Sequence, residues 1–326
     1  MVNMKALLLE TVGQPVSYKS FDLPDSPPEW QKIRLTHSAL NLRDIWMTKG
    51  LYPRIKLPCV LGSDGCGIRE GERVVINPGI EWGSNQNFPS KNFTILGMPH
   101  HGTFAQQVIV PAKNIYPCPL HLTSTEAAAL PLAGLTAYRA LFVKCKVQED
   151  EAVLITGIGG GVALAAFRFA LVMKCRVYIS SSSEDKINRA IAMGAAGGVN
   201  YNHPDWGKEL IRISGGIDIV IDGAGGDGMS EVLASCNYGA RICVYGGTAG
   251  MMTKIKPQPI FWKQIAILGS SMGSDQDFTN MLEFVQQKNI RPVIDDVIPL
   301  EEGLRGFEKM EMGRQFGKII FEHPQG

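Results

Sequence analysis

The chain has 326 residues, of which 45% are apolar and 19% are charged. This length favours two domains, and the composition supplies enough apolar side chains for full cores and too few charges for a disordered chain. Lys and Arg number 32 against 31 Asp and Glu, a formal net charge of +1, which argues against a nucleic-acid-binding surface.

Neither membrane insertion nor secretion is expected from the hydropathy pattern. No stretch approaches the roughly 20 uncharged apolar residues of a membrane helix, and the apolar run near the N-terminus is too short for a signal peptide. The seven cysteines are scattered and include no Cys-x-x-Cys pair, which is typical of reduced thiols. We therefore expect a cytoplasmic protein.

Residues 1–117 have the pattern of a mainly β domain. Short strand-like segments alternate with turns rich in glycine and proline, and little helix is expected. The predicted strands are 5–9, 33–35, 73–76 and 104–110.

The pattern changes after Ser124, where apolar helical segments begin to alternate with β-branched strands. Such strands, without polar alternation, are typical of a parallel sheet covered by helices on both faces, so we predict a doubly wound α/β domain. Predicted strands are 152–156, 176–180, 218–222, 241–245, 265–268 and 318–321; predicted helices are 162–173, 184–193, 229–235, 278–288 and 302–312. We place the domains at 1–117 and 118–264, with a C-terminal segment at 265–326.

A glycine cluster follows the strand at 152–156 and leads directly into an apolar helix. Its sequence is Gly157-Ile-Gly-Gly-Gly-Val-Ala163. Glycines let the backbone approach a pyrophosphate, and the helix N-terminus offers free N–H groups, so the pattern predicts a dinucleotide site. The literal G-x-G-x-x-G spacing fits imperfectly, and a glycine-rich turn without ligand is the alternative. No Lys-Ser/Thr follows, which excludes a P-loop.

The next strand ends in Ser180–Ser183, where an acidic residue would bind the ribose 2′-hydroxyl of NAD. The missing acid, with Lys186 close behind, favours NADP(H). Alternatively, Ser182 or Ser183 caps the following helix, and the nearby Glu184 and Asp185 weaken the case for NADP. Glycines also follow Asp222 and Tyr245, and we expect these strand exits to line the cofactor crevice.

Metal and nucleophile motifs are absent from the sequence. The six histidines and seven cysteines show no metal-ligand spacing, and the adjacent His100 and His101 are expected in an exposed loop. No Gly-x-Ser-x-Gly motif occurs, so a hydrolase is not favoured. We predict no bound metal.

Taken together, the motifs resemble the medium-chain dehydrogenase/reductase superfamily in its zinc-free quinone oxidoreductase branch. The resemblance covers nearly the whole chain. Its motifs, in family order, are Ala39–Asp44, Gly50–Pro53, Leu61–Gly65, Gly102–Ala105, Ala127–Tyr138, the glycine turn after Thr156, and Val199–Tyr201.

The resemblance implies a GroES-like catalytic domain, to which the C-terminal segment returns, and a Rossmann domain with NADP(H) in the cleft between them. It implies that Asn41 and Gly62-Ser63-Asp64 stand near the zinc ligands of zinc-dependent relatives. It also implies a homodimer through the edge strands of the Rossmann sheets, around 241–245 and 265–268. The cofactor residues we predict are Thr136, Gly159, Gly160, Gly161, Val162, Ser181, Ser182, Lys186, Tyr201, Gly246 and Met272; Lys186 and Tyr201 match family positions at the 2′-phosphate.

Two departures from the family pattern stand out. Between Gly67 and Gly71 the chain is about ten residues short, which is expected to clip a hairpin and leave a sheet edge unpaired. His101 stands where the family often has an acid before Gly102.

These observations predict NADPH-dependent hydride transfer to quinones or α,β-unsaturated carbonyls without a metal. Tyr52 is the leading proton-donor candidate and Asn41 the second, with Arg43 and Asp44 positioning them. Alternatively, Tyr52 only packs in a turn and solvent supplies the proton. Two other functions stay open: an enoyl-thioester reductase, and an NADPH-binding sensor with little turnover.

Overall fold

A computed structural model describes residues 2–324, which divide into two compact units. The first unit takes residues 2–135 and 273–324, and the second takes 136–272. The observed boundaries between the units, at 135/136 and 272/273, both lie later in the chain than the predicted boundaries at 117/118 and 264/265. The reason is packing: the helix at Ser124–Ala129 lies on strands of the first unit, and the strand at Ala266–Gly269 pairs within the second.

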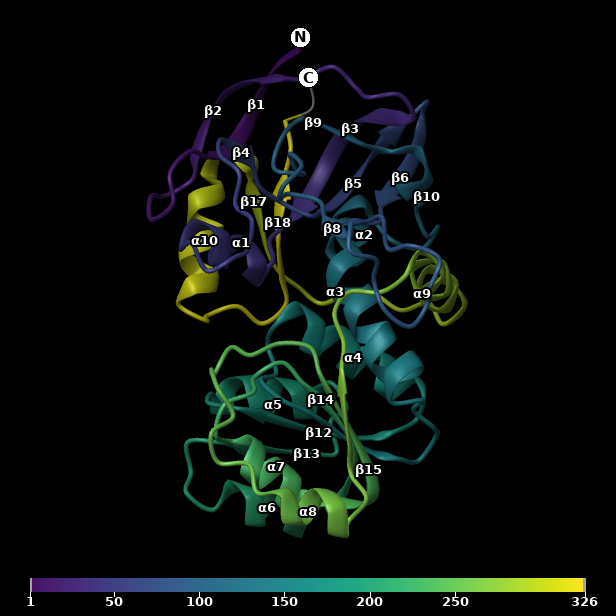
Figure 1. Ribbon diagram of the computed structural model, residues 1–326, viewed down its shortest axis with the longest axis vertical. Helices are drawn as coiled ribbons and strands as arrows, with labels where there is room; N and C mark the ends of the chain where they lie inside the picture. Colours follow the sequence, from purple (N-terminus) through teal and green to yellow (C-terminus); the bar gives the residue numbers. More distant parts are fainter. Residues whose placement is uncertain (1, 325–326) are drawn as a thin grey trace. The chain divides into compact units, whose positions relative to one another are not determined.

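The first unit is mainly β and is closed by the C-terminal part of the chain (Figure 1). Within the described residues it contains sheets ordered β2-β1-β4, β10-β6-β5-β3-β18-β17 with β9 also on β3, and β7-β8. Its elements are β1 (Val2–Leu9), β2 (Ser17–Leu23), β3 (Trp30–Ala39), α1 (Leu42–Thr48), β4 (Cys59–Val60), β5 (Asp64–Arg69), β6 (Glu72–Ile76), β7 (Gly79–Ile80), β8 (Thr94–Ile95), β9 (Gln107–Pro111), a 3-10 turn (Ala112–Asn114), β10 (Ile115–Pro117), α2 (Ser124–Ala129), α9 (Asp275–Gln287), β17 (Ile294–Pro299), a 3-10 turn (Leu300–Glu302), α10 (Gly303–Glu311) and β18 (Lys318–Glu322).

The shortened segment forms an ordered hairpin, and the expectation of an unpaired edge there is wrong. β5 and β6 pair up to Arg69 and Glu72, leaving only Glu70 and Gly71 as the loop. Both loop residues have positive φ, 50° and 87°, as a two-residue type I′ turn requires. β6 then pairs with β10 on its other side, so both edges of β6 are satisfied.

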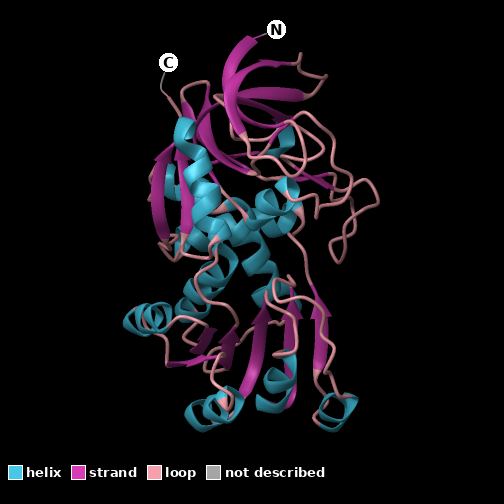
Figure 2. Cartoon of the chain, turned by 90° about the vertical axis from the view of Figure 1, so that its left-hand side faces the viewer, coloured by secondary structure: helices cyan, strands magenta, loops and turns pink. Residues whose placement is uncertain are grey.

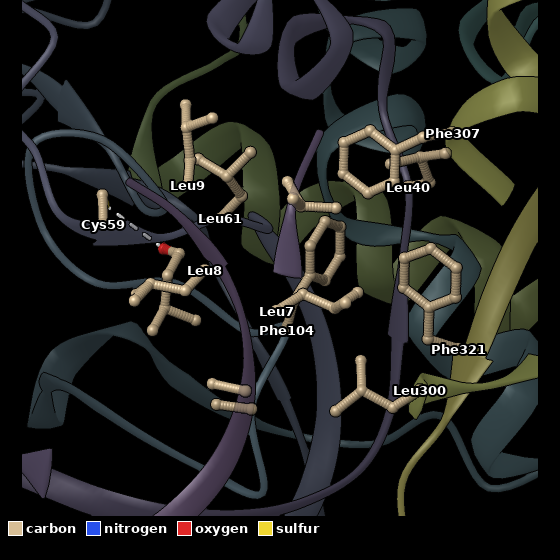
Figure 3. Close-up of a cluster of buried hydrophobic side chains, with 14 of the residues drawn as sticks. Leu7, Leu8, Leu9, Leu40, Cys59, Leu61, Phe104, Leu300, Phe307 and Phe321 are labelled. Atoms are coloured by element: carbon tan, nitrogen blue, oxygen red, sulfur yellow. Dashed lines mark hydrogen bonds between the residues drawn. The ribbon is translucent and has the colours of Figure 1, made fainter. Parts of the chain in front are cut away.

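The core of the first unit joins the beginning of the chain to its end (Figure 3). Phe104 meets Phe321 edge to face with ring centroids 4.9 Å apart, and Phe307 stacks on Phe321 at 6.4 Å. Leu7 and Leu300 belong to the same buried cluster. Burial of these large side chains holds β18 in the sheet, which explains why the C-terminal segment returns to this unit.

The second unit is a parallel sheet in the order β13-β12-β11-β14-β15-β16, with helices on both sides (Figure 2). Its elements are β11 (Ala152–Ile155), α4 (Gly161–Val172), β12 (Arg176–Ser181), α5 (Glu184–Ala192), β13 (Gly197–Asn200), α6 (Trp206–Ser214), β14 (Ile217–Asp222), α7 (Met229–Ser235), β15 (Cys236–Val244), α8 (Pro257–Trp262) and β16 (Ala266–Gly269). The helix α3 (Pro131–Tyr138) and the π-helical turn at Arg139–Lys144 lead into it.

Alternation along the strands explains why both faces of this sheet are covered. Leu154 and Val220 belong to a buried cluster that includes Trp206 and Leu210 of α6. Their strand neighbours, such as Val153, are equally buried and point to the opposite face. The order with β11 at the centre places the first crossover, and the glycine turn, at the switch point where ligands bind in such sheets.

The predicted fold class is confirmed: a Rossmann-type parallel sheet with a GroES-like, mainly β unit. The sequence patterns missed several elements, namely the helices α1, α6 and α8 and the strands β2, β4, β5, β7, β8, β10, β13 and β17. In the part of the chain that the structure describes, we find no helix with the length and hydropathy to cross a membrane.

Candidate active site

The glycine turn has the geometry that a pyrophosphate site requires. Gly157 and Gly159 have φ of 64° and 125°, and Gly160 is the N-cap of α4. A Cβ built on Gly157 or Gly160 meets no atom within 4 Å, so the backbone is bare there. The N–H of Ile158 donates to the carbonyl of Ser180 at 2.9 Å, which fixes the turn against the end of β12. These residues fit a dinucleotide phosphate.

A buried carboxylate ties two strand exits together beside this turn. The Thr156 hydroxyl donates to Asp222 at 2.6 Å, and the other Asp222 oxygen accepts from the N–H of Gly225 at 2.9 Å. Asp222 is 1% exposed. The carboxyl ends of β11 and β14 are therefore held in register, as the prediction that glycine exits line one crevice requires.

The predicted 2′-phosphate residues come from two neighbouring strand ends. β12 and β13 pair in parallel up to Ser181 and Asn200, and the N–H of Tyr201 donates to the Ser181 carbonyl at 3.1 Å. Ser182 and Tyr201 are exposed, and Lys186 is half-buried in the first turn of α5. Ser183 caps α5 by accepting from the N–H of Lys186, so the helix-capping interpretation is confirmed for Ser183. The role of these residues at a 2′-phosphate stays a prediction.

The remaining predicted cofactor residues lie at other points of the second unit. Gly161 and Val162 form the first turn of α4. Gly246 follows β15 and packs so closely on the Gly223 carbonyl that a Cβ would lie 2.8 Å from its oxygen. Thr136 and Met272, the first and last residues of the unit, are buried. Their cofactor roles stay predictions.

In the first unit, three buried polar side chains form a closed cluster. Lys318 Nζ donates to Asn41 Oδ1 at 2.6 Å and to Asp64 Oδ2 at 2.9 Å, and Asn41 Nδ2 donates to the same Asp64 oxygen at 2.9 Å. Asp64 Oδ1 accepts from the N–H of Leu132 at 2.7 Å. Both the oxygen and the nitrogen of the Asn41 side-chain amide are therefore hydrogen-bonded within this cluster. The role of Asn41 as the second proton-donor candidate stays a prediction.

Asp44 lies in the first turn of α1 and receives the N–H of Asn41 at 2.9 Å. Its other oxygen is buried without a hydrogen-bond partner. Burial raises the pKa of the Asp44 carboxyl to about 6, against the opposing pull of the neighbouring Arg43 charge.

Arg43 connects Tyr52 to the Gly62-Ser63-Asp64 segment. Its Nη1 donates to the Ser63 hydroxyl at 2.5 Å and to the Leu96 carbonyl at 2.8 Å. Its Nε lies 3.3 Å from the Tyr52 hydroxyl, and the guanidinium lies over the Tyr52 ring, 4.7 Å from the centroid. Tyr52 is half-buried and packs on the core, so the turn-packing alternative describes part of its role.

Within residues 2–324, no three His, Cys, Asp or Glu side chains are grouped so that they could hold a metal ion. His100 and His101 lie in a loop as predicted, but the expectation that the loop is exposed is wrong. His100 packs on Trp30 at 5.1 Å between ring centroids and His101 on Phe21 at 4.7 Å, and both are half-buried. Burial lowers the pKa of both imidazoles.

Sequence reasoning missed Lys318 altogether. The one available signal was a lysine at the start of an otherwise apolar strand, Lys-Ile-Ile-Phe-Glu. Its partners Asn41 and Asp64 are 277 and 254 residues away in the chain, so no local pattern pairs them.

Comparison with known proteins matches both units. Residues 27–120 match the family model "Alcohol dehydrogenase GroES-like domain" and residues 161–287 match "Zinc-binding dehydrogenase". The "Zinc-type alcohol dehydrogenase-like protein YogA" of Leptosphaeria maculans is 33% identical, with 95% of each chain covered. The bovine (Bos taurus) "Quinone oxidoreductase-like protein 2" is 26% identical over 98% of this chain and 91% of its own length, and the "Acryloyl-coenzyme A reductase" of Metallosphaera sedula is 27% identical over 97% and 99%.

A crystal structure described as an NAD-dependent alcohol dehydrogenase superimposes with a TM-score of 0.91, at 35% identity over 98% of this chain and 99% of that one. With the two-unit fold and the glycine turn, these matches show that the chain belongs to the medium-chain dehydrogenase/reductase superfamily. It is an oxidoreductase of this type, and the superfamily binds nicotinamide cofactors.

Proposed function

We propose that the protein transfers hydride from NADPH to quinones or α,β-unsaturated carbonyls without a metal. The observation that carries the proposal is the Arg43–Tyr52 pair, a cation-backed hydroxyl that Arg43 joins to Ser63. By the family resemblance, the Gly62-Ser63-Asp64 segment stands near the zinc ligands of zinc-dependent relatives. Such a group suits an acceptor whose oxygen becomes negative and whose conjugated system already spreads that charge.

The reaction balances with one hydride and one proton. Bound NADPH supplies the hydride to an electron-poor carbon of the acceptor. A proton from solvent completes the product, so a quinone becomes a hydroquinone and an enone becomes the saturated carbonyl, with NADP⁺ left. The protein's task is to align the two carbons and to stabilise the acceptor oxygen, for which Tyr52 is the leading residue.

NADPH is proposed over NADH because β12 ends at Ser181 and is followed by Ser182 instead of an acid, with Lys186 and Tyr201 close by in the fold. A structure described as NAD-dependent resembles this chain, so the choice between NADPH and NADH needs a test.

In Lys186→Glu, we expect the KM for NADPH to rise about tenfold or more, since a carboxylate repels the 2′-phosphate, and the KM for NADH to stay within about twofold. Lys208→Glu, on α6, is the control. Equal effects on both cofactors would contradict the proposal.

An enoyl-thioester reductase is the second candidate. Relatives described as acryloyl-coenzyme A reductases favour it, as do two exposed cations, Arg54 and Lys56, in the segment that follows Tyr52. If acyl-CoA is the substrate, Arg54→Glu with Lys56→Glu is expected to raise the KM for crotonyl-CoA severalfold and to leave the KM for a small enone unchanged. Equal KM values in variant and parent would remove this candidate.

We also propose a cytoplasmic homodimer. The strand expected at 241–245 is not an edge strand, because β15 pairs with β14 on one side and with β16 on the other. β16 is the edge strand, since it pairs only with β15 among the described strands, and Ile267 on it is 42% exposed. An exposed strand edge is usually covered in native proteins, and a second copy of this chain offers the matching edge.

The third candidate function is an NADPH-binding sensor. A protein of this kind would bind NADPH tightly but reduce no acceptor.

A further inference from the structure

The direction of the hydrogen bond between Arg43 and Tyr52 is fixed by chemistry. A guanidinium carries only donors, so Nε of Arg43 donates and the Tyr52 oxygen accepts at 3.3 Å. The hydroxyl hydrogen must therefore point away from Arg43. Among the described residues, none accepts a hydrogen bond from it. Tyr52 thus holds an oriented, unused O–H donor.

Arg43 is itself rigidly held, and the nearby charge that acts on it is that of the Asp44 carboxyl, which is not hydrogen-bonded to it. Nη1 is bound to Ser63 and Leu96, and the Ser63 hydroxyl also donates to Leu96 at 2.8 Å, which closes a small ring of bonds. The side chain is 7% exposed, yet it forms no ion pair within the described chain, and Nη2 has no hydrogen-bond partner. A buried cation without a bound carboxylate favours any negative charge that develops near it.

Both apolar and charged side chains are exposed next to Tyr52 in the chain: Leu51 precedes it, and Arg54 and Lys56 follow it. Leu51 is 69% exposed and Leu42, in the first turn of α1, is 37% exposed. An exposed leucine next to Tyr52 in the chain offers apolar contact to a flat, conjugated acceptor such as an aromatic quinone.

We propose that Arg43 is a positioning residue that fixes Tyr52 as a hydrogen-bond donor to the oxygen of the hydride acceptor. This inference rests on the proposed reductase function. As hydride reaches the acceptor carbon, negative charge develops on its oxygen, and the Tyr52 O–H donates to that oxygen while keeping its own proton. The proton that completes the product comes from water. A cation-backed hydroxyl is a stronger donor than a free one, because each bond polarises the next.

The test is a double-mutant cycle with NADPH and 9,10-phenanthrenequinone. We expect Tyr52→Phe and Arg43→Gln each to lower kcat about tenfold or more, and the double variant to be no slower than Tyr52→Phe, because both changes remove one donor. Binding of NADPH, followed by its fluorescence, is expected to be unchanged, since the glycine turn belongs to the second unit. Arg314→Gln, an exposed arginine of the first unit, is the control. The proposal would be overturned if the loss of kcat in the double variant equalled the product of the two single losses. An unchanged kcat in Arg43→Gln would also overturn it.

Because Arg43 is buried, Ser63→Ala provides a milder second variant that removes only one of the two Nη1 anchors. It is expected to lower kcat by a few fold, with a larger effect on kcat than on the KM for the quinone. Arg43→Lys is expected to recover little of the parent kcat. A single ammonium nitrogen cannot stand both where Nε contacts Tyr52 and where Nη1 binds Ser63 and Leu96. Full activity in Arg43→Lys would show that charge alone suffices and would contradict positioning.

A measurement without turnover separates this inference from the proposed function. The absorption of 4-(dimethylamino)cinnamaldehyde moves to the red when its carbonyl accepts a strong hydrogen bond, so it serves as the probe. We expect a red shift with the parent protein, its loss in Tyr52→Phe and its reduction in Arg43→Gln. A shift that depends on both residues in a protein that reduces no acceptor would defeat the proposed function alone. Turnover by the parent with a shift insensitive to both residues, or with no shift, would defeat the positioning role alone.

Discussion

Asp44 shows how a single buried carboxyl sets a pH dependence. The pKa of its folded form, about 6, lies above the value of an unfolded aspartate. A raised pKa means that the contribution of Asp44 to stability is complete below about pH 4 and is lost as the pH rises through 6. Asp44→Asn should therefore raise the free energy of unfolding at pH 7.5 by on the order of 2 kcal/mol, and the gain should vanish near pH 4.

Urea unfolding at the two pH values measures this difference. Asp64→Asn serves as the contrast: it removes the counter-charge of the buried Lys318 and is expected to destabilise by about 3 kcal/mol. A gain for Asp44→Asn that persists undiminished at pH 4 would contradict the account.

At the scale of elements, the β5–β6 hairpin depends on one backbone conformation. Gly71 has a φ of 87°, and a Cβ there would meet no atom within 4 Å, so Gly71→Ala is opposed only by the backbone. We expect it to cost about 1 kcal/mol of stability, whereas Glu70→Gly, at a φ of 50°, should be neutral or slightly stabilising. Thermal unfolding of both variants is the measurement. Equal melting temperatures for the two would argue against the two-residue turn.

The helices and strands also show how much of the fold local sequence patterns can predict. The alternation of strand and helix, and the glycine turn before α4, follow from local periodicity, so they were predictable from the residues alone. The shortened hairpin was misjudged because a two-residue turn replaces the longer family passage, and turn type depends on φ at Glu70 and Gly71. α6 was missed although its buried residues recur at helical spacing.

The hydrogen-bond partners of the polar site residues could not be predicted from the sequence, because they lie far apart in the chain. Arg43 meets Ser63 and Leu96, 20 and 53 residues away, and Lys318 meets Asn41 from the other end of the chain. The pairing of β3 with β5 and with β18 brings Ser63 and Lys318 to their partners, and no single segment encodes that pairing. The types of residue at the site were visible in the sequence, but their partners were not.

At the scale of the whole molecule, the proposed homodimer depends on the edge strand β16. Ile267→Lys places a charge on this edge and is expected to yield a monomer in sedimentation velocity, because a charged edge disfavours strand pairing. Ile211→Lys is the matched control, since Ile211 lies on α6 of the same unit and is 41% exposed against 42% for Ile267. Equal sedimentation of both variants and the parent would contradict pairing through this strand.

The central claim is hydride transfer from NADPH to a conjugated acceptor without a metal. Its most direct test follows NADPH absorbance with 1,4-benzoquinone, 9,10-phenanthrenequinone and a simple enone, beside NADH and with or without a chelator. We predict oxidation of NADPH by at least one acceptor, faster than that of NADH and undiminished by the chelator. Tight NADPH binding without oxidation, or activity abolished by the chelator, would contradict the claim.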